Sequence, residues 1–321
     1  MFNIVVIEIT DRCNLHCKYC YENPRKSCNT DMEVKRFKKF IENPQVDFNE
    51  CVLSGGEPLL HPQWREFVNI LRQNNMKVNF ISNGSQIKEI IQCSIKIDSI
   101  TISIDSFDEC YCKMRSPKPV CKKEDIIALI RSGLVEQLNL QVILSRVNAN
   151  KDNMSDIIDF CRQYKVGLKI KIMDDYIHNG TSDDALKESE YTVFLQEVAK
   201  LISEEDSFFI ELPEYGTNQF CSCAILQEKS NLRICSDGRM FACEKANDND
   251  MLIGSMEKDR EQISKRYNEV RLLLIARMIK LSKTFCSMCV YNNECNKGCP
   301  VVLKLLKENP KCQKGRMQNG V

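Results

Sequence analysis

The sequence predicts an α/β protein in which helices cover a largely parallel sheet. Its first half alternates short apolar runs with amphipathic helical stretches, and this pattern occurs six times. The apolar runs are nearly continuous, which is typical of strands buried on both faces of a sheet. Six such units fit either a partial barrel or an open doubly wound sheet, and periodicity alone leaves that choice open.

Each expected element follows from its own local pattern. The strands are short apolar segments bounded by polar or turn-forming residues, at 4–9, 51–54, 77–82, 99–104, 138–145 and 167–173. The intervening segments repeat apolar residues at helical spacing, at 31–41, 63–74, 123–132 and 153–164. Ligands bind at the carboxyl ends of the strands in both candidate folds, so the residues just after each strand are the first functional candidates.

The second half of the chain has a different residue pattern. A polar stretch at 178–184 ends the repeating pattern, and a helix is expected over about 186–202. From Cys221 onward cysteines and short turns dominate, with one long helical stretch near 256–281. We therefore expect a sheet domain over 1–185, a helical linker over 186–220 and a cysteine-rich domain over 221–321. A chain of 321 residues is long enough for this division.

Charge and hydropathy exclude several classes of partner. Lys and Arg total 45 against 44 Asp and Glu, so the net charge of +1 does not favour nucleic acid or an anionic membrane. The N-terminus is apolar for only a few residues before Glu8 and Asp11, unlike a signal peptide. No later run approaches the roughly 18 apolar residues of a membrane span. We expect a cytoplasmic protein with neither nucleic acid nor membrane as partner.

The nineteen cysteines are the most informative feature of the composition. Their share lies below the roughly 8–10% of a disulfide scaffold, and clustered cysteines in a reducing cytosol more often bind metal or react. Twelve of them form two groups near opposite ends of the chain. The other seven lack the spacing of a metal site: Cys28, Cys51, Cys93, Cys110, Cys112, Cys121 and Cys161.

The first group follows the first expected strand directly, as Cys13-x3-Cys17-x2-Cys20. Three thiolates on one loop suit a [4Fe–4S] cluster in which one iron keeps an open position for a substrate. A structural zinc site needs four ligands, and His16 is the alternative fourth. Because His16 adjoins Cys17, we expect its side chain to point away, which favours the cluster.

This loop resembles the signature of the radical S-adenosylmethionine superfamily, including the aromatic Tyr19 just before the last cysteine. The resemblance implies a partial, TIM-like (β/α)6 barrel, which agrees with the six units. It implies a cluster that receives an electron from a donor such as flavodoxin or ferredoxin. Reduction of S-adenosylmethionine there releases a 5′-deoxyadenosyl radical, which abstracts hydrogen from a substrate.

Two further motifs follow the second and third strands, where the resemblance implies cofactor contacts. Gly55 and Gly56 would let the backbone approach the methionine ammonium, and Glu57 would supply a complementary charge. Ser82 and Asn83 begin a Ser-Asn-Gly turn after the third strand. Ordinary Gly-Gly and Asn-Gly turns are the plainer alternatives.

The fourth strand closes on a third motif. Ser103 and Asp105 would hold ribose hydroxyls or the methionine carboxylate, and Arg115 resembles a family arginine. A solvated strand end and a surface arginine are the alternatives. The order of these motifs behind a three-cysteine loop favours an enzyme over a non-catalytic iron–sulfur or zinc scaffold or an electron carrier.

The second cysteine group resembles the SPASM extension of this superfamily, which holds two auxiliary [4Fe–4S] clusters; a zinc ribbon is the alternative. The resemblance assigns the outer cluster to Cys286, Cys289, Cys295 and Cys312. It assigns the inner cluster to Cys223, Cys243 and Cys299. Cys221 and Cys235 compete for the fourth inner position, and an open iron that binds substrate is also compatible with the pattern.

Proteins with this extension mostly act on peptides or proteins. The resemblance therefore implies oxidative modification of a ribosomally made peptide through a thioether or carbon–carbon cross-link. Oxidation of a sulfatase residue to formylglycine is an alternative, and Glu244 stands where such maturases have an aspartate base. Three residues precede the first expected strand, so we expect either a separate partner protein that recognises a leader peptide or a substrate that binds without one.

Three spare thiols lie in the loop after the fourth strand, on the face where substrate should enter: Cys110, Cys112 and Cys121. A thiol at this place would donate a hydrogen atom, as in radical peptide epimerases, or would ligate a metal. Incidental cysteines are the plainer interpretation. Epimerisation is therefore the third reaction that the sequence leaves open.

Overall fold

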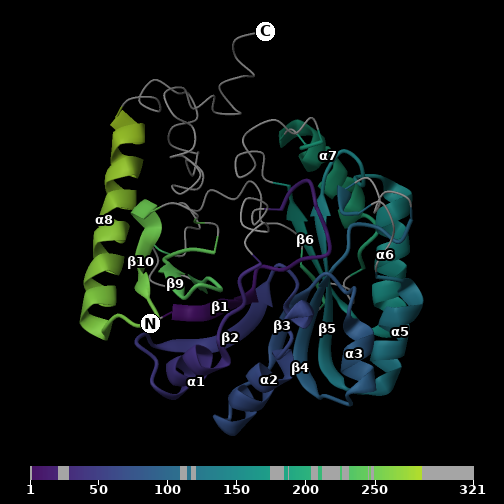
Figure 1. Cartoon of the computed structure of the whole chain (residues 1–321). Helices are drawn as coiled ribbons and strands as arrows, with labels where there is room; N and C mark the ends of the chain where they lie inside the picture. The colour runs from purple at the N-terminus through teal and green to yellow at the C-terminus, as the bar shows by residue number, and fades with distance from the viewer. Residues whose placement is uncertain are drawn as a thin grey trace.

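A partial, TIM-like barrel of parallel strands forms the centre of the molecule, as Figure 1 shows for the computed structural model. The structure describes residues 2–20, 29–108, 114–116, 121–173, 184–186, 188–203, 209–211, 225, 231–244, 246 and 249–283. Within these ranges ten strands form one sheet in the order β10-β9-β8-β1-β2-β3-β4-β5-β6-β7. Spatial order follows chain order from β1 to β7, which is the order of a barrel and not of a doubly wound sheet.

The six expected strands are all present. They are β1 (Phe2–Thr10), β2 (Phe48–Gly55), β3 (Asn79–Ser82), β4 (Ile97–Ser103), β5 (Val135–Leu144) and β6 (Gly167–Ile172). A short β7 (Ile210–Glu211) pairs with β6 in parallel. β3 begins two residues later than the sequence predicts. The Val78 N–H donates to the Asp98 carboxylate at 2.7 Å, so it is engaged by a side chain before the strand begins.

Most of the helices connect strands and cover one face of the sheet, whereas the last helix follows the final described strand (Figure 1). They are α1 (Val34–Glu42), α2 (Trp64–Gln73), α3 (Ile87–Gln92), α5 (Lys123–Ser132), α6 (Lys151–Tyr164), α7 (Glu188–Ala199) and α8 (Arg260–Lys283). The sequence analysis missed α3, which is too short for helical periodicity to be evident. Buried helix side chains such as Phe37 and Phe67 pack with the apolar strand residues in one core.

Strand residues alternate between this core and a polar inner face. In register across β4, β5 and β6, Ile102, Leu140 and Leu168 are fully buried on the helix side. The next residues along the three strands are only partly buried and form a row on the opposite face: Ser103, Gln141 and Lys169. Lys171, which is exposed, lies on the same face two residues further toward the carboxyl end of β6. The barrel therefore presents polar side chains on its inner face.

Three strands beyond residue 231 extend the same sheet: β8 (Leu232–Ile234), β9 (Arg239–Phe241) and β10 (Leu252–Ser255). β8 pairs with β1 in parallel, whereas β9 is antiparallel to both β8 and β10. A buried ion pair links Arg233 of β8 to Glu8 of β1, and Arg233 also donates to the Ala246 carbonyl oxygen at 3.0 Å. These strands of the expected cysteine-rich domain thus continue the barrel sheet. The boundaries at 185 and 220 stay predictions.

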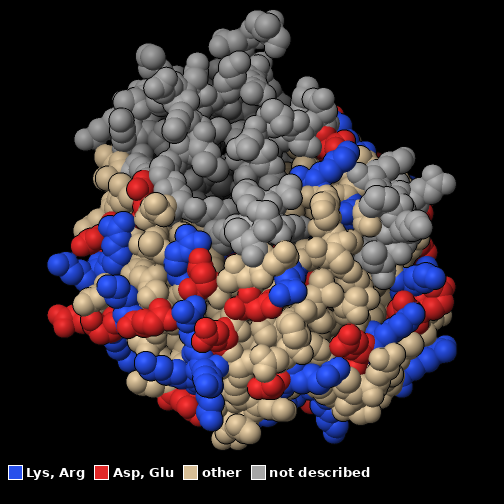
Figure 2. All heavy atoms as spheres, in the orientation of Figure 1, with Lys and Arg blue, Asp and Glu red and all other residues tan. Residues whose placement is uncertain are grey.

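The surface and the helices agree with the composition. On the face shown in Figure 2, Lys and Arg side chains are interspersed with Asp and Glu, as the net charge of +1 leads one to expect. Of the helices that the structure describes, none has the length and apolarity needed to cross a membrane.

Candidate active site

The three N-terminal cysteines lie on one loop at the carboxyl end of β1. Cys17 is buried, Cys13 and Cys20 are partly buried, and the Cys20 N–H donates to the Cys17 carbonyl oxygen at 3.1 Å. Among the described residues, no three Cys, His, Asp or Glu side chains converge on a single metal ion, and His16 is exposed. In a [4Fe–4S] cluster each cysteine binds a different iron, so three thiols on one loop suit a cluster with one iron left open. The choice of this cluster over zinc stays a prediction.

Gly55 and Gly56 hold the end of β2 directly against the start of this loop. The Gly56 N–H donates to the Thr10 carbonyl oxygen at 2.9 Å. The Glu57 N–H donates to the Arg12 carbonyl oxygen at 2.7 Å. A Cβ at Gly55 would lie 2.0 Å from the Thr10 oxygen, and one at Gly56 would lie 2.2 Å from the Arg12 oxygen. Residues with a side chain do not fit such an approach. The expected approach to the cofactor stays a prediction.

Glu57 is fully buried beside this contact. Its carboxylate accepts hydrogen bonds from the Ser82 hydroxyl at 2.8 Å, the Asn83 N–H at 2.6 Å and the Leu59 N–H at 3.3 Å. Burial raises the pKa of Glu57 to about 7, although these hydrogen bonds oppose the shift. An ionised carboxylate has about four acceptor sites, so these contacts leave room for one more donor.

Asn83 connects the Glu57 segment to the cysteine loop. Its side-chain Nδ2 donates to the Asn14 Oδ1 at 3.0 Å and to the Cys13 Sγ at 3.8 Å. Hydrogen bonds to cysteine sulfur influence the potential of an iron–sulfur cluster. The motifs that the sequence predicted after β2 and β3 thus meet the cysteine loop. Asn14 was not predicted, because no sequence signal distinguishes it from other loop asparagines.

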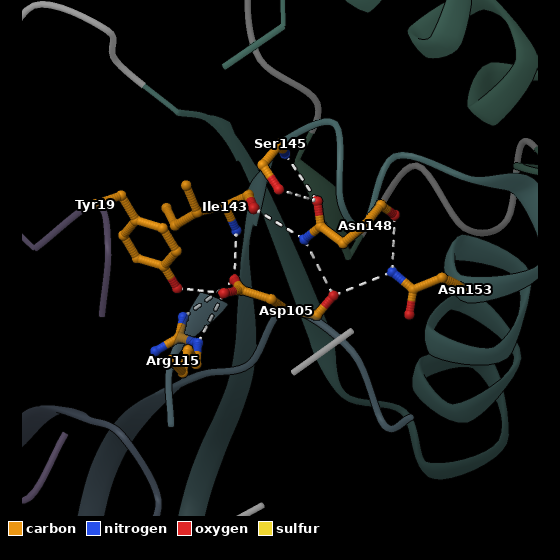
Figure 3. A network of polar contacts seen from close by, with 7 residues as sticks. All are labelled: Tyr19, Asp105, Arg115, Ile143, Ser145, Asn148 and Asn153. Atoms are coloured by element: carbon orange, nitrogen blue, oxygen red, sulfur yellow. Dashed lines mark hydrogen bonds and ion pairs between the residues drawn. The ribbon is translucent and has the colours of Figure 1, made fainter. Parts of the chain in front are cut away.

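Asp105 is the centre of a buried polar network that joins β4, β5 and the cysteine loop (Figure 3). The Arg115 guanidinium donates to both carboxylate oxygens, with Nε–Oδ2 and Nη2–Oδ1 distances of 2.9 and 3.1 Å. The Ile143 N–H donates to Oδ1 at 3.0 Å, and the Tyr19 hydroxyl donates to Oδ2. Asp105 is 0% and Arg115 4% exposed. In the structure these side chains bind one another, and the cofactor contacts that the sequence predicted for them stay a prediction.

Burial and neighbouring charges keep Tyr19 and Arg115 of this network protonated. Burial and the Asp105 carboxylate raise the pKa of Tyr19 well above its ordinary value, so its hydroxyl stays a donor. Burial alone would lower the pKa of Arg115, but Asp105 together with Tyr19 and Cys17 outweighs burial and raises that pKa. The Tyr19 hydroxyl therefore stays a donor and Arg115 stays charged over the physiological pH range.

Two asparagines that the sequence analysis missed hold the backbone of Asp105. Asn148 Nδ2 and Asn153 Nδ2 donate to the Asp105 carbonyl oxygen at 3.2 and 3.0 Å (Figure 3). Asn148 also accepts from the Ser145 N–H at 2.7 Å. The only sequence signal near them is Asn150, whose side chain accepts from the Asn153 N–H and caps α6. The end of β4 is thus fixed through both its side chain and its backbone.

Of the spare thiols, the structure describes Cys121, whereas Cys110 and Cys112 lie outside the described residues. Cys121 is buried in the core, and its sulfur packs so closely on Gly84 that a Cβ there would lie 2.4 Å from it. Burial raises the pKa of Cys121 to about 12. The Cys121 thiol is therefore protonated and contributes to the packing of the core. Its expected hydrogen-donor role stays a prediction.

The C-terminal ligand sets are described only in part. Cys235 is buried in the core, Cys243 is partly buried, and Glu244 is partly buried with its carbonyl oxygen 3.4 Å from Arg233 Nη1. The other predicted ligands lie outside the described residues: Cys221, Cys223, Cys286, Cys289, Cys295, Cys299 and Cys312. Cys221 and Cys235 stay alternatives for the fourth inner ligand, and the ligand sets stay predictions.

Comparison with curated proteins gives one family and several relatives. Residues 7–162 match the model of the Radical SAM superfamily. The chain is 26% identical over 286 residues to the probable GTP 3',8-cyclase of Methanococcus aeolicus, covering 81% of this chain and 91% of that protein. It is 23% identical over 264 residues to the S-adenosylmethionine-dependent nucleotide dehydratase of a Fibrobacter species, covering 73% of this chain and 75% of that protein.

Solved structures support the fold. The enzyme anSMEcpe with bound AdoMet and the Kp18Cys peptide has a TM-score of 0.66 at 19% identity, covering 93% of this chain and 89% of that chain. Streptococcus suis SuiB bound to the precursor peptide SuiA has a TM-score of 0.69 at 13% identity, covering 96% and 74%. At these identities the similarity establishes the arrangement of the strands and helices, and no more.

Proposed function

Residues 7–162 of this chain form a Radical SAM superfamily domain, and from this premise we propose that the enzyme modifies a ribosomally made peptide oxidatively, by cross-linking side chains. The observation that carries the proposal is the position of the cysteine loop at the carboxyl end of β1, where the Glu57, Asn83 and Asp105 segments meet. Enzymes of this superfamily use S-adenosylmethionine and a [4Fe–4S] cluster, which supply the radical when bound.

The residues of this chain would bind and orient that cofactor. Cys13, Cys17 and Cys20 would hold the cluster, and Glu57 would bind the methionine ammonium through its remaining acceptor site. The partly buried row that contains Ser103 and Gln141 would face the substrate across the inner face. The barrel would exclude water from these groups.

Peptide modification draws its support from the cysteine pattern in the second half of the chain. That pattern resembles the SPASM extension, whose auxiliary clusters accept electrons and suit a net oxidation. SuiB and anSMEcpe, which share the fold, have each been solved with a bound peptide. Formylglycine formation and epimerisation are the alternatives on the same class of substrate, and a separate leader-binding partner fits all three.

The pH dependence of S-adenosylmethionine binding tests the role of Glu57. Because its pKa in the folded protein is about 7, above the ordinary 4.5, Glu57 gains a proton as the pH falls below 7. A protonated carboxyl group does not attract an ammonium, so the Kd should rise by up to about tenfold per pH unit below 7. Anaerobic calorimetric titration of the reconstituted protein between pH 6 and 8 measures this.

Glu57→Gln provides the matched comparison. The loss of a charge-assisted contact, about 1.5–3 kcal/mol, should weaken binding by roughly ten- to a hundredfold at pH 8. The Kd of this variant should also lose most of its pH dependence below 7. Equal affinities and equal pH profiles in the two proteins would show that Glu57 is purely structural.

The identity of the product tests the proposed reaction. Co-expression with a peptide encoded beside this protein should yield a peptide lighter by two hydrogens, with one 5′-deoxyadenosine formed for each cross-link. Tandem mass spectrometry locates the bond and reports the mass. Formylglycine in a sulfatase would instead show that the protein is a sulfatase maturase. An unchanged peptide mass with a D-residue would indicate epimerisation.

A nucleotide substrate is the second candidate function. Two relatives that align over most of this chain are named for reactions of GTP or another nucleotide. Lys169 and the exposed Lys171 on the inner face of β6 would bind phosphate groups. Incubation of the reduced protein with GTP and S-adenosylmethionine, followed by chromatography of the nucleotides, separates the candidates. A new nucleotide product would replace the peptide proposal.

A further inference from the structure

The backbone on both sides of Cys17 is bound to the short segment that carries Arg115. The His16 N–H donates to the Arg115 carbonyl oxygen at 3.3 Å, and the Lys18 N–H donates to the Met114 carbonyl oxygen at 2.9 Å. Cys17 is thus held between two main-chain hydrogen bonds to the same partner segment. This arrangement fixes the backbone of Cys17 beside the segment that carries Arg115.

Side chains also connect the Arg115 segment to the cysteine loop. The Tyr19 hydroxyl donates to Asp105, and the Arg115 guanidinium carbon lies 5.4 Å from the centre of the Tyr19 ring (Figure 3). Arg115 is held in place by its two bonds to Asp105. A positive and a negative charge, held against each other, therefore lie next to the loop that carries the predicted cluster ligands.

We propose that Arg115 and Asp105 are positioning residues that hold the cysteine loop and set the reduction potential of the cluster bound there. The inference rests on the cluster of the proposed function, but not on its substrate. It differs from the role that the sequence predicted, in which these side chains contact S-adenosylmethionine directly. In the structure Arg115 directs its fork at Asp105.

The sign of each charge gives this proposal its test. Reduction adds one negative charge to a cluster, so Arg115 stabilises the reduced state and Asp105 opposes it. In the native pair the two effects largely cancel. Arg115→Gln leaves the Asp105 charge uncompensated and should lower the potential, whereas Asp105→Asn leaves the Arg115 charge uncompensated and should raise it. A purely structural disturbance has no reason to act with opposite signs in the two variants.

The measurement is a redox titration of the reconstituted enzyme followed by electron paramagnetic resonance, without S-adenosylmethionine. The signal of this cluster is the one that disappears when Cys13, Cys17 and Cys20 are replaced. Each variant should change the equilibrium constant for one-electron reduction by roughly tenfold, about 59 mV, in the stated direction. Arg115→Lys keeps the charge and should stay nearer to the wild-type potential than Arg115→Gln. Arg146→Gln is the matched control, because Arg146 pairs with Glu190 at an exposed site, and it should leave the potential unchanged.

Tyr19→Phe tests the mechanical part of the proposal. Removal of the hydroxyl deletes the bond to Asp105 and keeps the ring under Arg115. Hydrogen exchange at the His16 and Lys18 amides should then become severalfold faster than in the wild type.

The possible outcomes separate the proposals. Shifts of equal sign in Arg115→Gln and Asp105→Asn, or no shift in either, overturn the inference. So does loss of the signal from both while Arg115→Lys and Tyr19→Phe behave as wild type. An unchanged potential with weakened S-adenosylmethionine binding would instead establish the direct contact that the sequence predicted. Absence of the cluster signal from the wild type contradicts the proposed function itself.

Discussion

Replacement of Cys13, Cys17 and Cys20 together by alanine is expected to abolish the cleavage of S-adenosylmethionine. The three thiols occupy one loop beside the Glu57 and Asn83 segment, and without them the proposed cluster loses the three cysteines that would bind it. The reconstituted variant should contain about four fewer irons per chain than the wild type. Liquid chromatography of 5′-deoxyadenosine and an iron assay measure the two effects.

A cysteine outside both groups gives the matched control. Cys93 is a partly buried thiol at the end of α3, and Cys93→Ala should keep both the iron content and the cleavage. Iron that remains after loss of the loop cysteines measures the auxiliary clusters that the C-terminal pattern predicts. Cleavage at the wild-type rate in the triple variant would remove the basis of the site assignment.

Removal of Arg233 is expected to be the most destabilising single substitution in the described part of the sheet. Its guanidinium is 0% exposed and contacts the buried Glu8 carboxylate, with one of these bonds at 3.3 Å. Arg233→Ala leaves that charge buried and uncompensated, which costs about 3–5 kcal/mol. Urea unfolding of the reconstituted protein should show this loss as a lower midpoint of the barrel transition.

Two comparisons isolate the cause. Arg239→Ala removes the partner of Asp237 at an exposed site on the neighbouring strand β9 and should cost at most about 1 kcal/mol. The double replacement Glu8→Leu with Arg233→Met removes both charges and should recover most of the stability lost in Arg233→Ala. Equal losses for Arg233→Ala and Arg239→Ala would contradict a structural role of the buried pair.

The sequence predicts those parts of the fold that depend on residues close together along the chain. The six parallel strands, the main helices between them and the three-cysteine loop follow from apolar periodicity and cysteine spacing. The same patterns did not predict α3, whose six residues span less than two helical turns. They also did not predict that β8 pairs with β1, because that contact joins segments more than 200 residues apart, as does the Glu8–Arg233 pair.

The sequence predicted where the motifs lie in the fold, but not which residue each side chain contacts. Motif order predicted that Glu57, Asn83 and Asp105 would gather at the carboxyl ends of the strands, and the structure brings each of them into contact with the cysteine loop or its flanks. Gly56 meets the carbonyl oxygen of Arg12, and Arg115 meets Asp105. Such pairings depend on the tertiary arrangement of separate loops, which spacing along the chain does not encode.

The most direct test of the account is the reaction of the wild-type protein with S-adenosylmethionine alone. After anaerobic reconstitution with iron and sulfide and reduction by dithionite, the protein should form 5′-deoxyadenosine and methionine in equal amounts, and the unreduced protein should form neither. Quantitative liquid chromatography with mass spectrometry gives both yields. S-adenosylmethionine that stays intact beside a fully reduced cluster would contradict the assignment of this loop as the radical-generating site.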